Sequence, residues 1–200
     1  MPGRMRTDCC AWRLEPPCLG LPLPFTIGLK MIKPHPLVQI ARQTIEAYLA
    51  GGESAKIAIL LPADLPVRAA TFVSLHIDGR LRGCIGTLEP QAPTLIEEVK
   101  HNAIAASMRD PRFPPVTLAE MPRLEISVDV LTPAQPAQRE DLDPRRFGVI
   151  VECGWRRGVL LPNLEGVDAV EQQLSIACQK AGIGPHEPYR IYRFEVQRFH

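Results

Sequence analysis

The sequence lacks any apolar run long enough to cross a membrane, because proline and charged residues interrupt each hydrophobic stretch well before the roughly 20 residues that a spanning helix needs. It also lacks an excess of charge of either sign, since 23 Lys and Arg balance 22 Asp and Glu for a formal net charge of +1. A chain with so little net charge has no strong field with which to attract nucleic acid or anionic lipid. These absences predict a soluble, cytoplasmic protein without a membrane partner.

The six cysteines include no C-x-x-C pair, and those beyond residue 33 are odd in number and widely spaced: Cys84, Cys153 and Cys178. This spacing argues against a disulfide framework or a zinc knuckle, and it favours a reducing compartment. His76 and His101 lack the short ligand spacing that would make a metal site with Cys84, so we expect no metal. No Walker loop, nucleophile elbow or dinucleotide fingerprint occurs, and the cofactor, if any, is unknown from sequence.

The first 33 residues differ from the rest, because they hold a proline-rich run from Pro16 to Pro24 and no sustained periodicity. Such a composition buries too little apolar surface to order itself. We therefore predict that residues 1–33 are a disordered leader, or that the start is assigned at an upstream codon and translation really begins near Met31. The domain should then occupy residues 34–200.

Hydrophobic periodicity predicts helices and strands in the order of an α+β domain, with an antiparallel or mixed sheet flanked by helices. No internal repeat is visible in the sequence. The Asp78-Gly79 pair predicts a tight hairpin turn, and Thr94 with Glu97 predicts a helix start. The expected elements are helices over 37–49, 94–108 and 168–181, hairpins over 73–87 and 147–161, a loop over 132–136, and strands over 124–130 and 192–196.

The return strand of the first hairpin carries the segment most suggestive of chemistry. A two-residue turn would place Leu75 opposite Arg82 and Val73 opposite Cys84, so that Arg82 and Cys84 share one face. A guanidinium about 7 Å from a thiol favours the nucleophilic thiolate. Cys84 is thus a candidate nucleophile, or else a small inert buried residue.

Two glycines flank this cysteine, Gly83 and Gly86. Glycine weakens a strand unless a bulge, or a close approach of backbone or ligand, requires the missing side chain. Both are therefore candidate binding positions.

A second polar group follows the 94–108 helix. Asn102 lies in that helix, and Asp110 and Arg112 stand on either side of Pro111. An Asx turn at Asp110 is the structural interpretation. If the turn lies against the hairpin, these three polar residues instead converge on a shared pocket.

Several segments resemble the successive motifs of the AMMECR domain proteins, which are named from a human chromosomal region linked to Alport syndrome, midface hypoplasia and elliptocytosis. The resemblance runs from about Leu37 to Val196, and the segments that carry it are Leu81-Arg82-Gly83-Cys84-Ile85-Gly86, Asn102-Ala103, Asp110-Pro111-Arg112-Phe113, Ser127-Val128, Leu160-Leu161-Pro162 and Lys180-Ala181-Gly182.

The resemblance implies a two-lobed single domain with the hexapeptide 81–86 in a cleft between the lobes. It also implies partners, because microbial relatives resemble protein A of a system with a Memo-like protein and a radical S-adenosylmethionine enzyme. Two hypotheses follow. The chain is an enzyme or enzyme subunit of a modification pathway, in which Cys84 attacks a small or nucleotide-like substrate anchored by Arg82. Alternatively, it is a non-catalytic adaptor for a protein or nucleic acid.

Overall fold

The computed structural model describes residues 33–52 and 59–200, which fold into helices and two four-stranded antiparallel sheets. The first sheet and its helices comprise α1 Pro36–Leu49, β1 Thr71–Ile77, β2 Arg80–Gly86, α2 Leu95–Met108, the 3-10 helix η1 Leu118–Arg123, β3 Glu125–Leu131 and β8 Val196–Phe199. The second comprises β4 Gln135–Ala137, the 3-10 helix η2 Arg139–Asp141, β5 Gly148–Cys153, β6 Arg156–Leu160, α3 Val170–Ala181 and β7 Arg190–Phe194. The predicted α+β class is confirmed.

The expected leader, with its three cysteines, lies outside the described residues except for Lys33. The domain boundary at residue 34 stays a prediction. Within the described residues, every helix is too short or too polar to cross a membrane.

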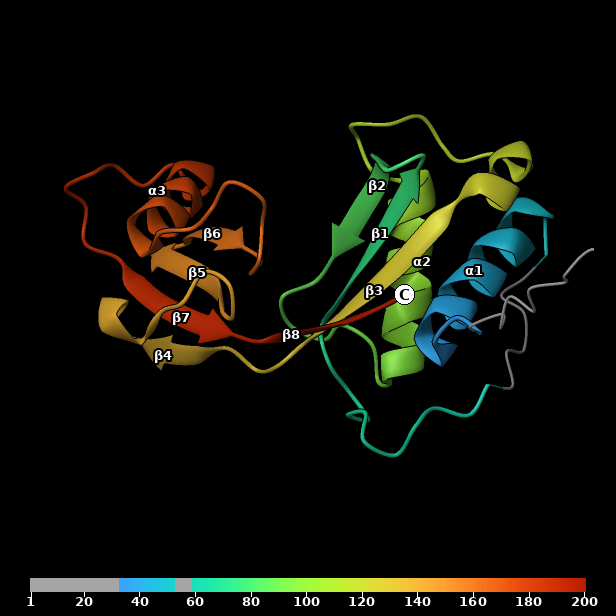
Figure 1. The fold of residues 1–200 in the computed structure, drawn as a ribbon, viewed down its shortest axis with the longest axis horizontal. Coiled ribbons are helices and arrows are strands. Elements are labelled where there is room, and N and C mark those ends of the chain that lie inside the picture. Colours follow the sequence, from blue (N-terminus) through green and yellow to red (C-terminus); the bar gives the residue numbers. More distant parts are fainter. Residues whose placement is uncertain (1–32, 53–58) are drawn as a thin grey trace, which may run out of the picture. The chain divides into compact units, whose positions relative to one another are not determined.

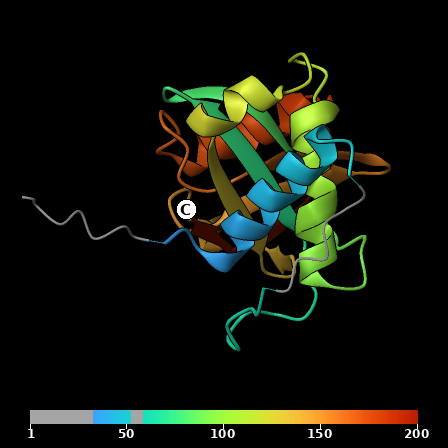
Figure 2. The same ribbon diagram turned by 90° about the vertical axis from the view of Figure 1, so that its right-hand side faces the viewer.

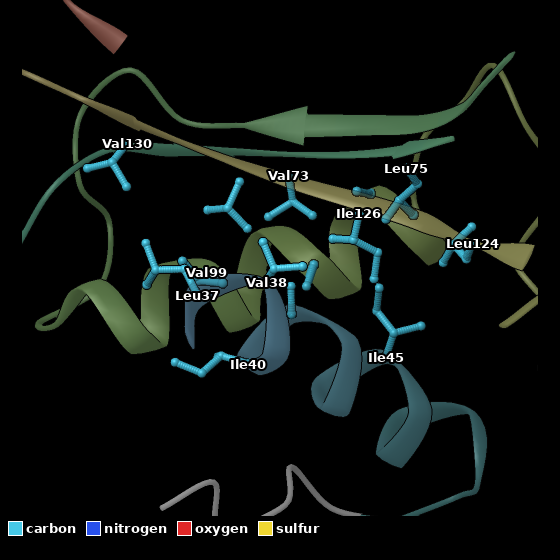
Figure 3. Packing of buried hydrophobic residues seen from close by; sticks show 14 of the residues in the cluster. Leu37, Val38, Ile40, Ile45, Val73, Leu75, Val99, Leu124, Ile126 and Val130 are labelled. Atoms are coloured by element: carbon cyan, nitrogen blue, oxygen red, sulfur yellow. The ribbon is translucent and has the colours of Figure 1, made fainter. Parts of the chain in front are cut away.

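The first half is held together by the side chains that α1 and α2 bury against one face of their sheet. The two helices lie side by side (Figure 2). Strand alternation turns Val73 and Leu75 of β1 toward them, and Figure 3 shows these side chains meeting those of the helices. Burying each such Leu, Ile or Val contributes about 1.5–3 kcal/mol, so this cluster is the main support of the first sheet. Its fully buried members include Leu37, Ile40, Ile45, Val73, Leu75 and Val99.

The second half repeats this plan with one helix. Leu174 and Ala177 of α3 pack on β5 and β6, and Gly182 ends the helix in the left-handed conformation at φ 65°. The predicted start of this helix at residue 168 is two residues early, since the helix begins at Val170. Ala169 occupies the cap position, and the Asp168 carboxylate instead pairs with Arg145 at 3.3 Å.

The two halves share a topology that the sequence does not reveal. Each runs hairpin, helix, strand: β1, β2, α2, β3 in the first and β5, β6, α3, β7 in the second (Figure 1). The sheet orders correspond, β2-β1-β3-β8 and β6-β5-β7-β4. The chain leaves the first sheet after β3 to add β4 to the second sheet, and it leaves the second sheet after β7 to add β8 to the first. The fold is therefore a structural repeat with a reciprocal strand exchange.

The exchanging segments cross at Thr132 and Glu195. The Thr132 backbone N–H donates to the Glu195 carbonyl at 3.0 Å, and the Glu195 N–H donates to Thr132 Oγ1 at 2.8 Å. The predicted single strand over 192–196 is wrong, because the chain leaves the second sheet after Phe194 and enters the first at Val196. The loop predicted over 132–136 likewise ends early, where β4 begins.

A small cluster of Ala70, Leu131, Ile150 and Phe194 packs residues from both halves together beside this crossing.

Candidate functional site

The hairpin that carries the hexapeptide turns where predicted. Asp78 and Gly79 adopt φ values of 51° and 73°, as a type I′ turn requires. The predicted register then fails, because a bulge makes Arg82 an extra residue: His76 pairs with Leu81, but Leu75 pairs with Gly83. Cys84 consequently lies opposite Ser74 rather than opposite Val73.

Cys84 belongs to a polar row that crosses three strands on the sheet face turned away from α2. Ser74 pairs with Cys84 on one side and with Ser127 on the other. The Ser74 hydroxyl donates to Cys84 Sγ at 3.1 Å, and Cys84 is partly buried. The thiol therefore lies among hydroxyls rather than in the hydrophobic core.

In the second half, the row at the corresponding positions consists of residues that pack in a hydrophobic cluster. Its corresponding positions are Val159, Ile150 and Tyr192, which are paired in the same order across β6, β5 and β7. Val159 and Tyr192 pack on the cluster that contains Ile150. Two serines and a thiol in the first half thus replace residues that bury apolar surface, which fits a site rather than a core.

The Asp110 turn lies against the hairpin at Cys84. Asp110 Oδ2 accepts from the Cys84 backbone N–H at 2.8 Å, and Arg112 Nη2 donates to the Cys84 carbonyl at 3.2 Å. Arg112 is held in turn by Asp110, with Nη2 to Oδ2 at 2.7 Å. The acid and base together therefore pair with the outward peptide groups of edge strand β2, as a neighbouring strand would. Lys180 does part of this in the second half, donating to the Val159 carbonyl at 3.3 Å.

The charges around Cys84 are set by two ion pairs. Hydrogen bonds from Arg112 and from the Cys84 amide hold the pKa of the buried Asp110 carboxyl far below its usual range, against the opposing effect of burial. The pKa of Arg112 is raised, chiefly by its hydrogen bond to Asp110 and further by the charge of Cys84. Arg198 pairs with Asp129 at 2.7 Å, and its pKa is raised first by Asp129 and last by Cys84. One ion pair, Arg112 with Asp110, therefore binds the Cys84 peptide directly, and the second, Arg198 with Asp129, lies on the same face of the sheet.

Arg112 and Arg198 keep side-chain exposures of 54% and 43%. They therefore remain accessible to an anionic ligand.

Arg82 does not share the surroundings of Cys84. Its guanidinium donates to Glu120 Oε1 at 2.8 Å and to the carbonyls of Pro114 at 2.8 Å and Pro115 at 3.2 Å. Hydrogen bonding from Arg82 lowers the pKa of Glu120 to about 2. The expectation of a common face for Arg82 and Cys84 is wrong, because the bulge redirects Arg82 to the segment before η1. Its role as a substrate anchor stays a prediction.

Both glycines have packing reasons. A Cβ on Gly83 would lie 2.2 Å from the Ala106 carbonyl oxygen of α2, and one on Gly86 would lie 2.2 Å from the Phe72 ring. In the same way, a Cβ on Gly158 would lie 1.9 Å from the Ala177 carbonyl oxygen of α3. The close approach expected at Gly83 and Gly86 is therefore made by the protein itself; their binding roles stay predictions.

Asn102 is buried, and its amide donates to the Thr71 carbonyl at 3.0 Å and to Thr71 Oγ1 at 2.9 Å. It ties α2 to β1 and forms no hydrogen bond with Asp110 or Arg112, so the three predicted polar residues do not converge as one set.

Sequence reasoning also left out Arg198, which reaches the site only through the strand exchange. Ser74 and Ser127 were visible as polar positions of alternating strands, but nothing in the sequence aligned them with Cys84.

The hexapeptide begins beside a hollow of about 620 Å³ at the hairpin tip, lined by Leu81 and Arg82 but not by Cys84. A cleft centred on Cys84 stays a prediction. Within residues 33–52 and 59–200, no group of three or more His, Cys, Asp or Glu side chains is placed to hold a metal.

Comparison with known proteins agrees with the residue pattern. A model of the AMMECR1 family matches residues 38–199. The chain belongs to the AMMECR1 family. It is 49% identical over 173 residues to a Thermotoga maritima protein, covering 84% of this chain and 99% of that protein. A Clostridium acetobutylicum relative is 46% identical over 165 residues, covering 82% of this chain but 35% of the longer protein.

Among solved AMMECR1-type structures, the crystal structure of the uncharacterized protein PH0010 from Pyrococcus horikoshii superposes with a TM-score of 0.69 at 36% identity, covering 81% of this chain and 88% of that one.

Proposed function

We propose that this AMMECR1-family protein is an enzyme, or an enzyme subunit, that acts through Cys84 on a small substrate carrying an anionic group. The observation that carries the proposal is the placement of the Cys84 thiol in a hydroxyl row, with the half-exposed Arg112 guanidinium bound to its carbonyl at 3.2 Å. Cysteine attacks as its thiolate. The partly exposed guanidinium groups of Arg112 and Arg198 suit binding of an anionic substrate group.

In the proposed step, the Cys84 thiol loses its proton to solvent and the sulfur lone pair forms a bond to an electrophilic carbon of the substrate. The leaving group departs with the electron pair of the broken bond. The Asp110 and Arg112 side chains hold the Cys84 peptide in place during this step, because both bind its backbone groups. They are positioning residues for the thiol, and the Arg112 side chain is 54% exposed, so that a substrate can contact it.

The test is iodoacetamide labelling at pH 7 with each cysteine resolved by peptide mass spectrometry. Cys178 is the internal control, because burial raises the pKa of its thiol. We expect Cys84 to label at least about tenfold faster than Cys178. Cys153 is the stricter control, since Arg156 Nη2 lies 3.3 Å from its sulfur. Equal rates for Cys84 and Cys178 would rule out an activated nucleophile.

Removal of one site cation sharpens the test. Arg198→Gln should slow labelling of Cys84, whereas Arg145→Gln, at an ion pair with both side chains about three-quarters exposed, should leave it unchanged. The same slowing in both variants would mean that no local cation acts on the thiol.

A second candidate is the adaptor function. Among the described residues the Cys84 thiol has a hydroxyl partner, Ser74, and no hydrogen-bonded His, Asp or Glu to serve as a base. The proposed partners, by family resemblance, are a Memo-like protein and a radical S-adenosylmethionine enzyme. Co-purification with wild-type and Arg112→Glu protein tests this, and equal recovery of the partners would count against binding at this face.

We also propose a cytoplasmic location, because Cys84, Cys153 and Cys178 are all free.

A further inference from the structure

A cavity of about 630 Å³ lies between the face of the second sheet turned away from α3 and three segments, 64–70, 88–90 and 130–134. Its lining includes Ile150 of β5 and Tyr192 of β7 but no residue of the hexapeptide. We propose that this cavity binds a small apolar molecule that carries one anionic group. Its volume falls within the range of small-molecule sites, about 300–1,000 Å³. The proposal is independent of Cys84 chemistry.

The floor of the cavity is apolar. Ala70, Leu131 and Ile150 are each 4–5% exposed and form one cluster, with Leu88 and Tyr192 packed against it. Such a floor gives an apolar ligand surface to bury. The Tyr192 hydroxyl has no hydrogen bond within the described part of the chain, so it remains available as a donor or acceptor for the ligand.

The wall formed by residues 88–92 is held in place by polar contacts. The buried Glu98 carboxylate accepts from the N–H groups of Gln91 at 2.8 Å and Ala92 at 2.7 Å. Arg157 ties Glu89 to β6 at 3.1 Å. The cavity is therefore preformed, and a ligand would not have to order this wall on binding.

The charges at the rim favour an anion at one position. Arg157 is matched by two carboxylates, Glu89 at 3.1 Å and Glu152 at 3.2 Å. Arg68 is held only by carbonyls, with Nη2 to Pro90 O at 2.8 Å and Nε to Ala92 O at 3.1 Å. Its charge is thus oriented by two fixed hydrogen bonds and has no carboxylate partner in the described structure.

Asp64 also lines the cavity. A carboxylate repels a bound anion, so removing the charge of Asp64 serves as a control for removing the charge of Arg68.

Two fluorescent probes that share an N-phenyl-naphthylamine skeleton test the proposal on the full chain. One is 8-anilinonaphthalene-1-sulfonate, which is a monoanion, and the other is N-phenyl-1-naphthylamine, which is neutral. Wild-type protein should bind both saturably. Arg68→Gln should weaken the sulfonate by about tenfold and leave the neutral probe unchanged, since a charge-assisted contact is lost only for the anion. Arg68→Lys should restore part of the sulfonate affinity, and Asp64→Asn should not weaken it.

Leu88→Trp places a larger side chain in the wall and should weaken both probes, with circular dichroism checking that the variant folds. Leu88→Met is its control of similar volume. Three results overturn the proposal: no saturable binding of either probe, equal weakening of both probes by Arg68→Gln, or unchanged binding of both by a folded Leu88→Trp variant.

Discussion

The hexapeptide's first glycine gives the sharpest stability prediction, because it decides between a packing role and a ligand role. In Gly83→Ala, the new Cβ would lie 2.2 Å from the Ala106 carbonyl oxygen, where ordinary contacts begin near 3.4 Å. The obstacle is helix backbone rather than a flexible side-chain end. Strand β2 and α2 must therefore move apart by about 1 Å, a gap that forfeits roughly a quarter to a half of each contact energy across it.

The magnitude follows from what α2 buries. Leu95, Val99 and Ala103 are 0–1% exposed and face the sheet in the main cluster. Overpacking of a tight core costs about 1–3 kcal/mol, and weakened contacts along a whole helix add to it, so we expect a loss of about 2–4 kcal/mol. That is a large part of the roughly 5–15 kcal/mol by which domains of this kind are stable.

Urea unfolding followed by circular dichroism measures this loss. Gly158→Ala should behave alike, because its Cβ would lie 1.9 Å from the Ala177 carbonyl oxygen. Gly184→Ala is the matched control: its nearest contact is 3.5 Å, so its effect should stay within about 0.5 kcal/mol. A Gly83→Ala protein as stable as wild type would refute the packing explanation and return this glycine to the list of ligand contacts.

Two further substitutions separate positioning residues from structural ones. Asp110→Asn should cost about 2–3 kcal/mol at pH 7. Folding lowers the pKa of Asp110, so its carboxylate stabilises the protein above the unfolded pKa of about 4, and this stabilisation declines below that pH. The difference in free energy of unfolding between wild type and Asp110→Asn, measured in urea, should therefore narrow by about 1 kcal/mol at pH 3. A difference that does not change with pH would contradict the ion-pair origin. Arg82→Gln removes the Glu120 ion pair and should cost about 1–3 kcal/mol while leaving Cys84 labelling unchanged. A matching fall in the labelling rate would place Arg82 in the site, and exposed Arg123→Gln is the control.

Local chemistry made much of the fold predictable. Period-3.6 spacing located the three helices, and the Asp78-Gly79 pair located the first hairpin turn. These signals act within a few residues, where the backbone's own preferences decide the outcome. The family, too, was recognisable from short motifs, and its match over residues 38–199 agrees with them.

Register and strand partners were not predictable in the same way. At the bulge, the Arg82 guanidinium binds Glu120, which is 38 residues away along the chain, and Gly83 packs against α2. The break at Glu195 arises because two distant segments cross there. No local pattern in the final strand distinguishes one long strand from two short ones.

The sequence by itself therefore determined the class of fold, the family and the segment in which Cys84 lies. Only the tertiary structure decided what surrounds that thiol: Ser74 rather than Val73 lies opposite it, and Arg112 rather than Arg82 binds its peptide group. The physical reason is that a one-residue bulge turns the alternation of a strand over, and a strand exchange brings Arg198 from the end of the chain.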